Sequence, residues 1–454
     1  MCGVNRLAAI SMCVAVALLG AKGIVLGQDS LWSLNQCIEY AGEHSLEIQG
    51  EDLKTKNAAS QERQAEWAMA PSINASASQT FTFSDPVNVA GTGQVSKNLR
   101  TTSLSIGASM TLFDGLAKLR NIQYQRLVLQ GQEASRANTL ANIGLAVTEA
   151  YFNVVYQAEL VRTQEEQVAS SKEQVELGKW RVEAGAIPQG ALYDLQAQLA
   201  SDEQALVNAE NALSTAQLTL EQTMNYVSDT PLRISRPAID SASLPHVPTG
   251  GAIPIYEVAM QSYPSLQYSK ALVTQQEKQI QIARSSYWPE LSLSASYGST
   301  AQFYMDQMHN PKSNPLLTQL KDNDGWNLQL SLTIPIFNGF RTYEGVVRAK
   351  IAHQESLVNL RKEEKALLKN IQTAYLDAVS SWRQLLAARN NVRAQGEAFR
   401  WAKEKIAVGA ISAYDYNLAK TNSSKAQVTL LQATFNYLYK VKILDFYQGK
   451  EIVL

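Results

Sequence analysis

The sequence predicts a mainly helical fold with a small β part, built from two copies of one unit. Three observations carry this prediction. A hexapeptide at Met110–Gly115, M-T-L-F-D-G, returns as I-P-I-F-N-G at Ile334–Gly339, an offset of 224 positions. Before each copy, apolar and polar residues alternate. After each copy, a proline-free stretch carries apolar residues at intervals of seven. Periods of two and seven are those of β-strands and of coiled-coil helices.

The charge balance and the scattered histidines argue against nucleic-acid binding and catalysis. Forty Lys and Arg stand against 41 Asp and Glu, so the chain has no basic excess that would hold nucleic acid. The four histidines occur in separate segments, and the sequence contains no HExxH, P-loop, GxSxG or GxGxxG motif. We therefore expect no enzyme activity, no cofactor and no bound metal.

Residues 1–27 are predicted to be a secretory signal peptide. Arg6 supplies a positive charge, Leu7–Leu19 is a short apolar run, and Val25–Gly27 offers small residues for cleavage. Cleavage there removes two of the three cysteines and leaves Cys37 without a disulfide partner. No later segment has 18 consecutive apolar residues, so the sequence predicts no membrane-spanning helix.

The duplication divides the remaining chain into two structural repeats. We expect a first repeat over residues 28–240, a proline-rich connector over 228–254 and a second repeat over 255–454. Each repeat is predicted to contain a helix, two strands, a long helix and a return helix. The expected strands are 71–83, 102–113, 289–304 and 325–337; the long helices are 115–184 and 339–408, and the return helices are 190–227 and 413–447.

The predicted strands have one apolar face and one face of uncharged polar residues. In the first strand, Ile73, Ala75 and Phe81 alternate with serine, asparagine and threonine. Such faces are typical of a wall with lipid on one side and a watery lumen on the other. A soluble amphipathic sheet is the alternative. Because about eight strands are needed to close a barrel, four per chain predict an oligomer, with eight strands in a dimer or twelve in a trimer.

The long helices are predicted to pack in left-handed coiled coils. The first carries a heptad series at Leu140, Val147, Val154, Val161, Val168, Val175 and Val182. Shifted by 224 positions, six of these seven positions remain apolar. A helix of about 70 residues is ~105 Å long, whereas a return helix of about 38 residues is ~57 Å long. Two short helices stacked end to end therefore match one long helix.

These residues resemble the TolC-like outer-membrane efflux proteins, also called outer membrane factors. The resemblance covers essentially the whole chain after the signal peptide. It is carried by L-F-D-G and I-F-N-G at the strand-to-helix junctions and by A-G-A-I and V-G-A-I at the helical turns. It implies a trimer whose helical hairpins form an α-barrel tunnel across the periplasm. Four strands per chain would join a shared transmembrane β-barrel in the outer membrane.

The same resemblance implies a function and partners. The protein would be the passive exit duct of a tripartite efflux or type I secretion system, opened at its helical tips. Partners would be a periplasmic adaptor (a membrane fusion protein), an inner-membrane pump of RND or ABC type, and the outer-membrane lipid. The alternative is a non-conducting coiled-coil protein of the cell envelope or surface, whose strands only cap a helical stalk.

Two aspartates are candidates for a channel constriction. Asp415 matches the family's tip aspartate in the second repeat without a gap, and Asp194 matches it in the first if two residues are inserted after Pro188. A ring of carboxylates in a narrow lumen attracts cations and repels anions. Capping of a helix N-terminus is the alternative role. The arginine of the family's tyrosine–arginine clasp falls on Ile411, so that closing contact is missing.

The remaining candidate residues belong to the turns at the two ends of the long helices. The helical tips would contact the adaptor, because small side chains permit close approach; a helix reversal without a partner is the alternative. The predicted tip residues are Gly185, Ala186, Ile187, Pro188, Gly409, Ala410, Ile411 and Ser412. The junction between barrel and tunnel is predicted at Phe113, Asp114, Gly115, Phe337, Asn338 and Gly339.

Overall fold

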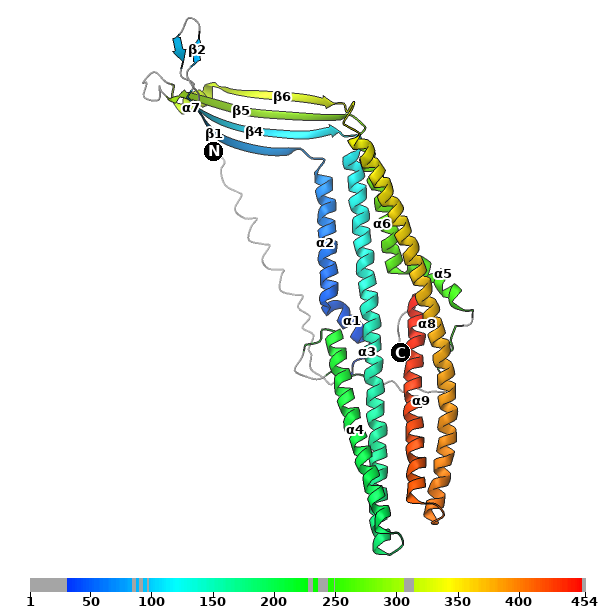
Figure 1. Ribbon diagram of the computed structural model, residues 1–454. Helices are drawn as coiled ribbons and strands as arrows, with labels where there is room; N and C mark the ends of the chain where they lie inside the picture. Colours follow the sequence, from blue (N-terminus) through cyan, green and yellow to red (C-terminus); the bar gives the residue numbers. More distant parts are fainter. Residues whose placement is uncertain are drawn as a thin grey trace, which may run out of the picture.

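The computed structural model describes residues 31–83, 87–89, 93–95, 98–227, 232–235, 244–248, 250–305 and 314–450. The predicted signal peptide and parts of the connector lie outside the described residues. A four-stranded sheet stands at one end of a long helical body, and two helical turns form the other end (Figure 1). No helix in the described ranges combines the length and the apolar character needed to cross a membrane.

Both repeats show the same order of main elements. The first contains α1 (Leu34–His44), α2 (Leu46–Trp67), β1 (Ser72–Thr82), β2 (Val87–Val89), β3 (Gly93–Val95), β4 (Leu99–Phe113), α3 (Ala117–Glu183) and α4 (Gln189–Thr223). The second contains α5 (Ala252–Ser262), α6 (Pro264–Ser285), β5 (Glu290–Tyr304), α7 (Leu316–Asp322), β6 (Asp324–Thr333), α8 (Arg341–Ala407) and α9 (Ala413–Tyr447). The repeats differ between their two sheet strands, where the first has β2 and β3 and the second has α7.

The first helix of each repeat is broken at an equivalent position, although its sequence pattern predicts one continuous helix. In the first repeat the break is at Ser45, whose hydroxyl accepts a hydrogen bond from the Glu47 backbone N–H at 3.2 Å. In the second it is at Tyr263, 218 positions later, where Pro264 begins α6. A serine N-cap and a proline at the first helical position both favour a new helix start.

The sheet is antiparallel with the strand order β1-β4-β5-β6, and its register collects the apolar side chains on one face. Ala75, Ile106, Tyr297 and Trp326 lie side by side across the four strands. The last strand ends at Thr333, before the predicted end at 337. Pro335 follows it and has no N–H to donate to a neighbouring strand.

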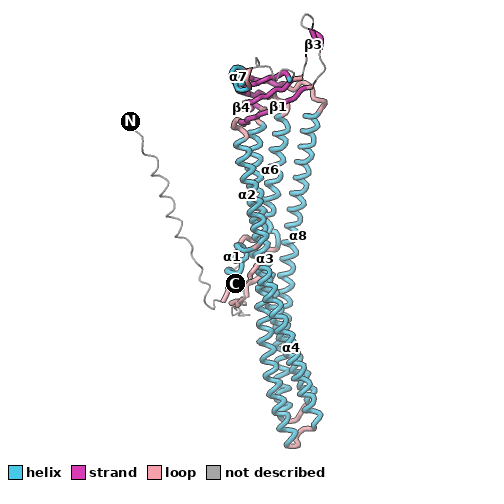
Figure 2. Tube along the Cα trace, turned by 90° about the vertical axis from the view of Figure 1, so that its left-hand side faces the viewer, coloured by secondary structure: helices cyan, strands magenta, loops and turns pink. Residues whose placement is uncertain are grey.

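Each half of the helical body consists of one long helix and shorter helices stacked beside it. Helices α3 and α8 each have 67 residues, a length of about 100 Å, and α4 and α9 each have 35. Along α3, α2 lies above α4; along α8, α6 lies above α9 (Figure 1). In the perpendicular view the long helices run from the sheet to the turns (Figure 2).

The core lies at the mid-height of the helical body. Of the predicted heptad positions, Val147, Val154, Val168 and Val175 are buried, whereas Leu140 is on the border of exposure. The core joins α1, the start of α2, α3, α4, α8 and α9, and segments of the connector enter it. The Tyr151 hydroxyl, for example, donates to the Ser235 carbonyl oxygen at 2.7 Å. The connector is therefore packed into the core where it is described.

Candidate functional site

The two helical tips are turns of the same backbone shape. Gly185 has φ 69° and Gly409 has φ 71°, a left-handed conformation that suits glycine. The backbone N–H of the residue after each glycine closes the turn. Ala186 donates to Arg181 O at 2.7 Å, and Ala410 donates to Lys405 O at 2.9 Å. Each return helix then starts from an extended cap residue, Pro188 or Ser412. The eight predicted tip residues thus form two equivalent, largely exposed turns.

The two candidate constriction aspartates do not occupy equivalent positions. The caps Pro188 and Ser412 are 224 residues apart, so the turns match without an insertion, and Ala191 is the equivalent of Asp415. Asp415 N donates to Ser412 Oγ at 3.1 Å, and that hydroxyl donates to Asp415 Oδ2 at 2.7 Å. Asp415 therefore takes part in a helix cap. Asp194 is exposed and one turn further along α4.

A cleft of about 460 Å³ separates the two tips. Its walls come from α3, α4, α8 and α9 and include Arg181, Asp194 and the half-buried Ile411, the position that the resemblance assigns to the clasp arginine. Tyr416 lies at the cleft with 2% of its surface exposed, and burial raises the pKa of its hydroxyl. The cleft leaves an open space between the two hairpins beside the turns.

A buried polar cluster joins the hairpins further from the tips. The Lys420 ammonium on α9 donates to Ser171 Oγ on α3 at 2.6 Å and lies 3.8 Å from Asp202 Oδ2 on α4. Ser171 donates to the same Asp202 carboxylate, which also accepts from Gln198 Nε2 at 2.8 Å. Lys420 and Asp202 are 3% and 8% exposed, and burial lowers the pKa of Lys420 while Asp202 opposes this shift. The sequence analysis missed this cluster, because its residues are distant in the chain and interrupt no heptad.

The two strand-to-helix junctions also share one backbone conformation. Gly115 and Gly339 have φ of 67° and 64°, and the residues that follow them are left-handed as well. Asp114 Oδ2 accepts from the Lys118 N–H at 3.0 Å, whereas Asn338 Nδ2 donates to Thr342 Oγ1 at 2.6 Å. Phe113 and Phe337 precede these turns, at the edge where the sheet meets the helices.

The surroundings of the two junction glycines differ. A Cβ at Gly115 would lie 2.7 Å from both Ser285 O and Trp288 Cβ. A Cβ at Gly339 would have nothing within 4 Å. Phe337 is correspondingly 77% exposed, against 39% for Phe113.

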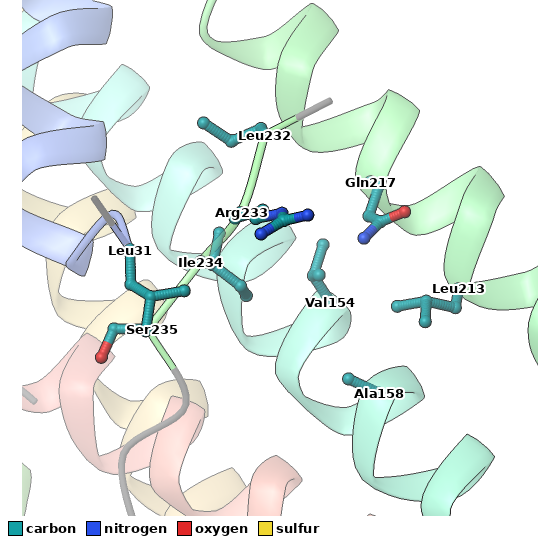
Figure 3. A pocket seen from close by; sticks show the side chains of 9 residues that line it. All are labelled: Leu31, Val154, Ala158, Leu213, Gln217, Leu232, Arg233, Ile234 and Ser235. Carbon is teal, nitrogen blue, oxygen red and sulfur yellow. The ribbon is translucent and has the colours of Figure 1, made fainter. Parts of the chain in front are cut away.

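A second hollow, of about 510 Å³, lies at mid-height between α3, α4 and a described part of the connector (Figure 3). Leu31, Val154, Leu213 and Ile234 give it a mostly apolar lining, to which Arg233 and Gln217 add polar groups. The sequence analysis treated 228–254 only as a linker, and no periodicity in that segment signals a pocket. In the described part of the chain, no three His, Cys, Asp or Glu side chains come together as metal ligands.

Comparison with known proteins gives one consistent result. The model of the outer membrane efflux protein family matches residues 38–225 and 255–449. The probable efflux pump outer membrane protein TtgC of Pseudomonas putida is 24% identical over 356 residues, which cover 76% of this chain and 68% of that protein.

Two solved structures share the fold. The Campylobacter jejuni CmeC outer membrane channel superimposes with a TM-score of 0.73 at 19% identity, over 94% of this chain and 90% of CmeC. The Neisseria gonorrhoeae MtrE outer membrane channel, solved in its open state, gives 0.72 at 17% identity, over 93% and 90%.

Proposed function

The chain belongs to the outer membrane efflux protein family, and from that premise we propose that three copies form the passive exit duct of a tripartite efflux or type I secretion system. The observation that carries this proposal is the unclosed sheet. Strands β1 and β6 are its edges, and neither has a second partner among the described residues. A sheet with two open edges and one apolar face is completed by further strands of the same kind.

The helical body supplies the wall of the proposed tunnel. Two hairpins per chain, each about 100 Å long on its longer side, extend from the sheet in one direction (Figure 1). Three copies would place six hairpins around a central space that continues into the strands. Substrate would move through this space without binding chemistry, and the energy for transport would come from an inner-membrane pump.

The exposed tips are the proposed contact with a periplasmic adaptor. Their left-handed glycines and adjacent small residues leave the backbone accessible, and the cleft between the tips gives each hairpin room to move. Asp194 and Asp415 are the proposed constriction. The exposed Asp194 carboxylate would contribute most to it, because Asp415 is also engaged by its helix cap.

Conductance in planar lipid bilayers tests the proposal. Purified mature protein should insert as an oligomer and give discrete, reproducible current steps. A folded oligomer that gives no current, even after its tips are loosened by substitution, would contradict the duct. The non-conducting stalk predicts instead that the protein fractionates without outer-membrane insertion and shows no change in gel mobility on heating.

A further inference from the structure

Residues in the helices and sheet strands of the first repeat have equivalents in the second at one of two fixed sequence offsets. The same offsets relate the strand pairs of the two repeats. Residues from α2 to β1 correspond to residues 218 positions later, and residues from β4 to α3 correspond to residues 224 positions later. Ser76 pairs with Ser105 in the first repeat. The offsets convert this pair into Ser294 and Gln329, which are partners in the second repeat. The internal symmetry is therefore accurate to the residue within the sheet.

Inside one chain, the end of the first repeat packs against the start of the second. Strand β4 pairs with β5, and α3 packs against α6. By the same offsets, β6 and α8 at the end of the second repeat have the shape to pack against a β1 and an α2. Within the described residues they have no such neighbour, because the chain's own β1 and α2 lie on the far side of the first repeat.

The exposure of equivalent residues shows which faces lack a cover. Ser285 on α6 is 2% exposed, whereas its equivalent on α2, Trp67, is 76% exposed. On the long helices, the Leu127 carbonyl oxygen accepts from the buried Gln275 at 3.0 Å, but Ile351, the equivalent of Leu127, is 57% exposed. Large apolar side chains are thus exposed at the positions where the other repeat makes a contact.

We infer that a second copy of this chain covers these faces in one defined register. Gln329 then lies opposite Thr80 of the partner subunit, and Leu330 lies opposite Gln79 of the partner subunit. The pairs follow from Ser105 with Gly298 and from Ile106 with Tyr297. Helix α8 packs on the partner's α2. The inference rests on the proposed assembly of several copies and adds its register.

Side-chain chemistry agrees with this register. Leu328 faces the partner's Phe81 on the apolar side, where Gln79 of the partner subunit is the one polar residue on that face of its strand. Ser331 faces the partner's Ser78 on the polar side. A shift by one residue would reverse the faces of one strand. In the helices, Arg120 Nη1 donates to Gln281 O at 2.9 Å within the chain. The equivalent residues are Glu344 and the partner's Arg63, whose opposite charges form an ion pair across the interface.

Engineered disulfides test the register in the full-length protein in its membrane. The two variants carry the predicted partners in one chain: Gln329→Cys with Thr80→Cys, and Leu330→Cys with Gln79→Cys. Any disulfide must join two copies, because β1 and β6 of one chain are three strand spacings apart, about 14 Å, which exceeds disulfide reach. Two neighbouring pairs are used because only one of them has the short spacing of a non-hydrogen-bonded pair.

Matched controls keep one cysteine and move the other by two residues, which preserves the face: Gln329→Cys with Ser78→Cys, and Leu330→Cys with Phe81→Cys. After mild oxidation, at least one predicted pair should convert most of the protein into a linked ladder that stops at the closed ring. The shifted pairs should link several-fold less. Stronger linkage of a shifted pair would overturn the register.

Charge reversal gives a second, independent measurement. Glu344→Arg or Arg63→Glu alone should lower the yield of assembled protein, and the double variant should recover it. No recovery would count against the helix contact. If current steps persist while neither predicted disulfide nor charge recovery occurs, the register is wrong and the duct stands. If the protein neither assembles nor gives current, both the register and the proposed duct are wrong.

Discussion

The two strand-to-helix junctions have one backbone and two environments. Gly115 is enclosed by the end of α6 and the residues before β5, where an added Cβ would collide with Ser285 and Trp288. Gly339, with nearly the same φ, faces open space. Local sequence therefore sets the turn, whereas the neighbouring repeat sets its surroundings. The second junction has no such neighbour among the described residues of one chain.

The largest loss of stability is expected from valine at Gly115, and a much smaller loss from valine at Gly339. Gly115→Val adds a β-branched side chain to a left-handed position and places its Cβ against backbone and indole atoms. Gly339→Val adds only the backbone strain, roughly 1–2 kcal/mol, to a single chain. Urea unfolding of detergent-solubilised monomer should therefore show a clearly larger loss for Gly115→Val.

The two glycines should also differ in their effect on assembly. Gly339→Val should lower oligomer yield on a native gel by more than its small effect on the monomer explains. Gly115→Ala and Gly339→Ala serve as the milder matched pair. Equal losses of monomer stability at both positions would show that backbone strain alone determines the outcome.

The next prediction compares the loss of a contact between the two hairpins with the loss of a contact inside one hairpin. Lys420→Met removes the buried ammonium that joins α9 to α3 and α4 and leaves Asp202 buried without its cationic partner. Loss of one partner from a buried pair costs about 3–5 kcal/mol. The control is Lys440→Met, because Lys440 and Asp377, 2.9 Å apart, join only α9 and α8 and are partly exposed. That change should cost up to about 1 kcal/mol.

Thermal or urea unfolding measures both losses. The double variant Lys420→Met with Asp202→Leu should recover much of the stability, because no buried charge remains. Lys420→Met should also raise bilayer conductance, since α9 is less firmly held above the tip cleft. A loss no greater than that of Lys440→Met would contradict a joint between the hairpins.

A smaller effect is expected from the carboxylates at the tips. Asp194→Ala with Asp415→Ala should raise conductance and weaken block by multivalent cations, because the proposed constriction loses negative charge. Asp415→Asn, which keeps a polar side chain beside Ser412, separates the charge from the helix cap. If neither conductance nor cation block changes, the two aspartates form no constriction, and Asp415 acts only as part of its helix cap.

The smallest effect is expected at Cys37, whose thiol should not be labelled in the native protein. This side chain is fully buried in the core, and burial raises its thiol pKa from 9.0 to about 12. At pH 8 the native mature protein should not react with a thiol reagent, whereas unfolded protein should react at one site. Because the folded pKa is the higher one, this group's contribution to stability is complete below pH 9 and is lost as the pH rises toward 12. Rapid labelling of native protein would contradict this burial.

The sequence predicted those features that depend on local pattern. The alternating runs predicted which side chains share a face of the sheet, and the registers of all four strands confirm it. The repeated L-F-D-G and I-F-N-G segments located both glycine turns, since a left-handed residue has a strong preference for glycine. Heptad spacing predicted burial at Val147 and Val154.

Features that depend on distant contacts were not predicted. Nothing near Lys420 in the sequence indicates that Ser171 and Asp202 lie beside it, because the three residues come from three helices. The pairing of Asp194 with Asp415 required an inserted gap, whereas backbone equivalence of the turns needs none. The helix breaks at Ser45 and Tyr263 were not predicted either, because the helical spacing of apolar residues continues on both sides of each break.

Thiol labelling at Trp67 tests most directly whether another copy completes the second repeat. Trp67→Cys should react rapidly with a maleimide in dissociated monomer and slowly in the assembled protein, since its equivalent, Ser285, is buried within the chain. Lys56→Cys is the matched control on the same helix, because both Lys56 and its equivalent Thr274 are exposed. It should react equally in both states. Equal reactivity of Trp67→Cys before and after assembly would contradict the covering of α2 by a second copy.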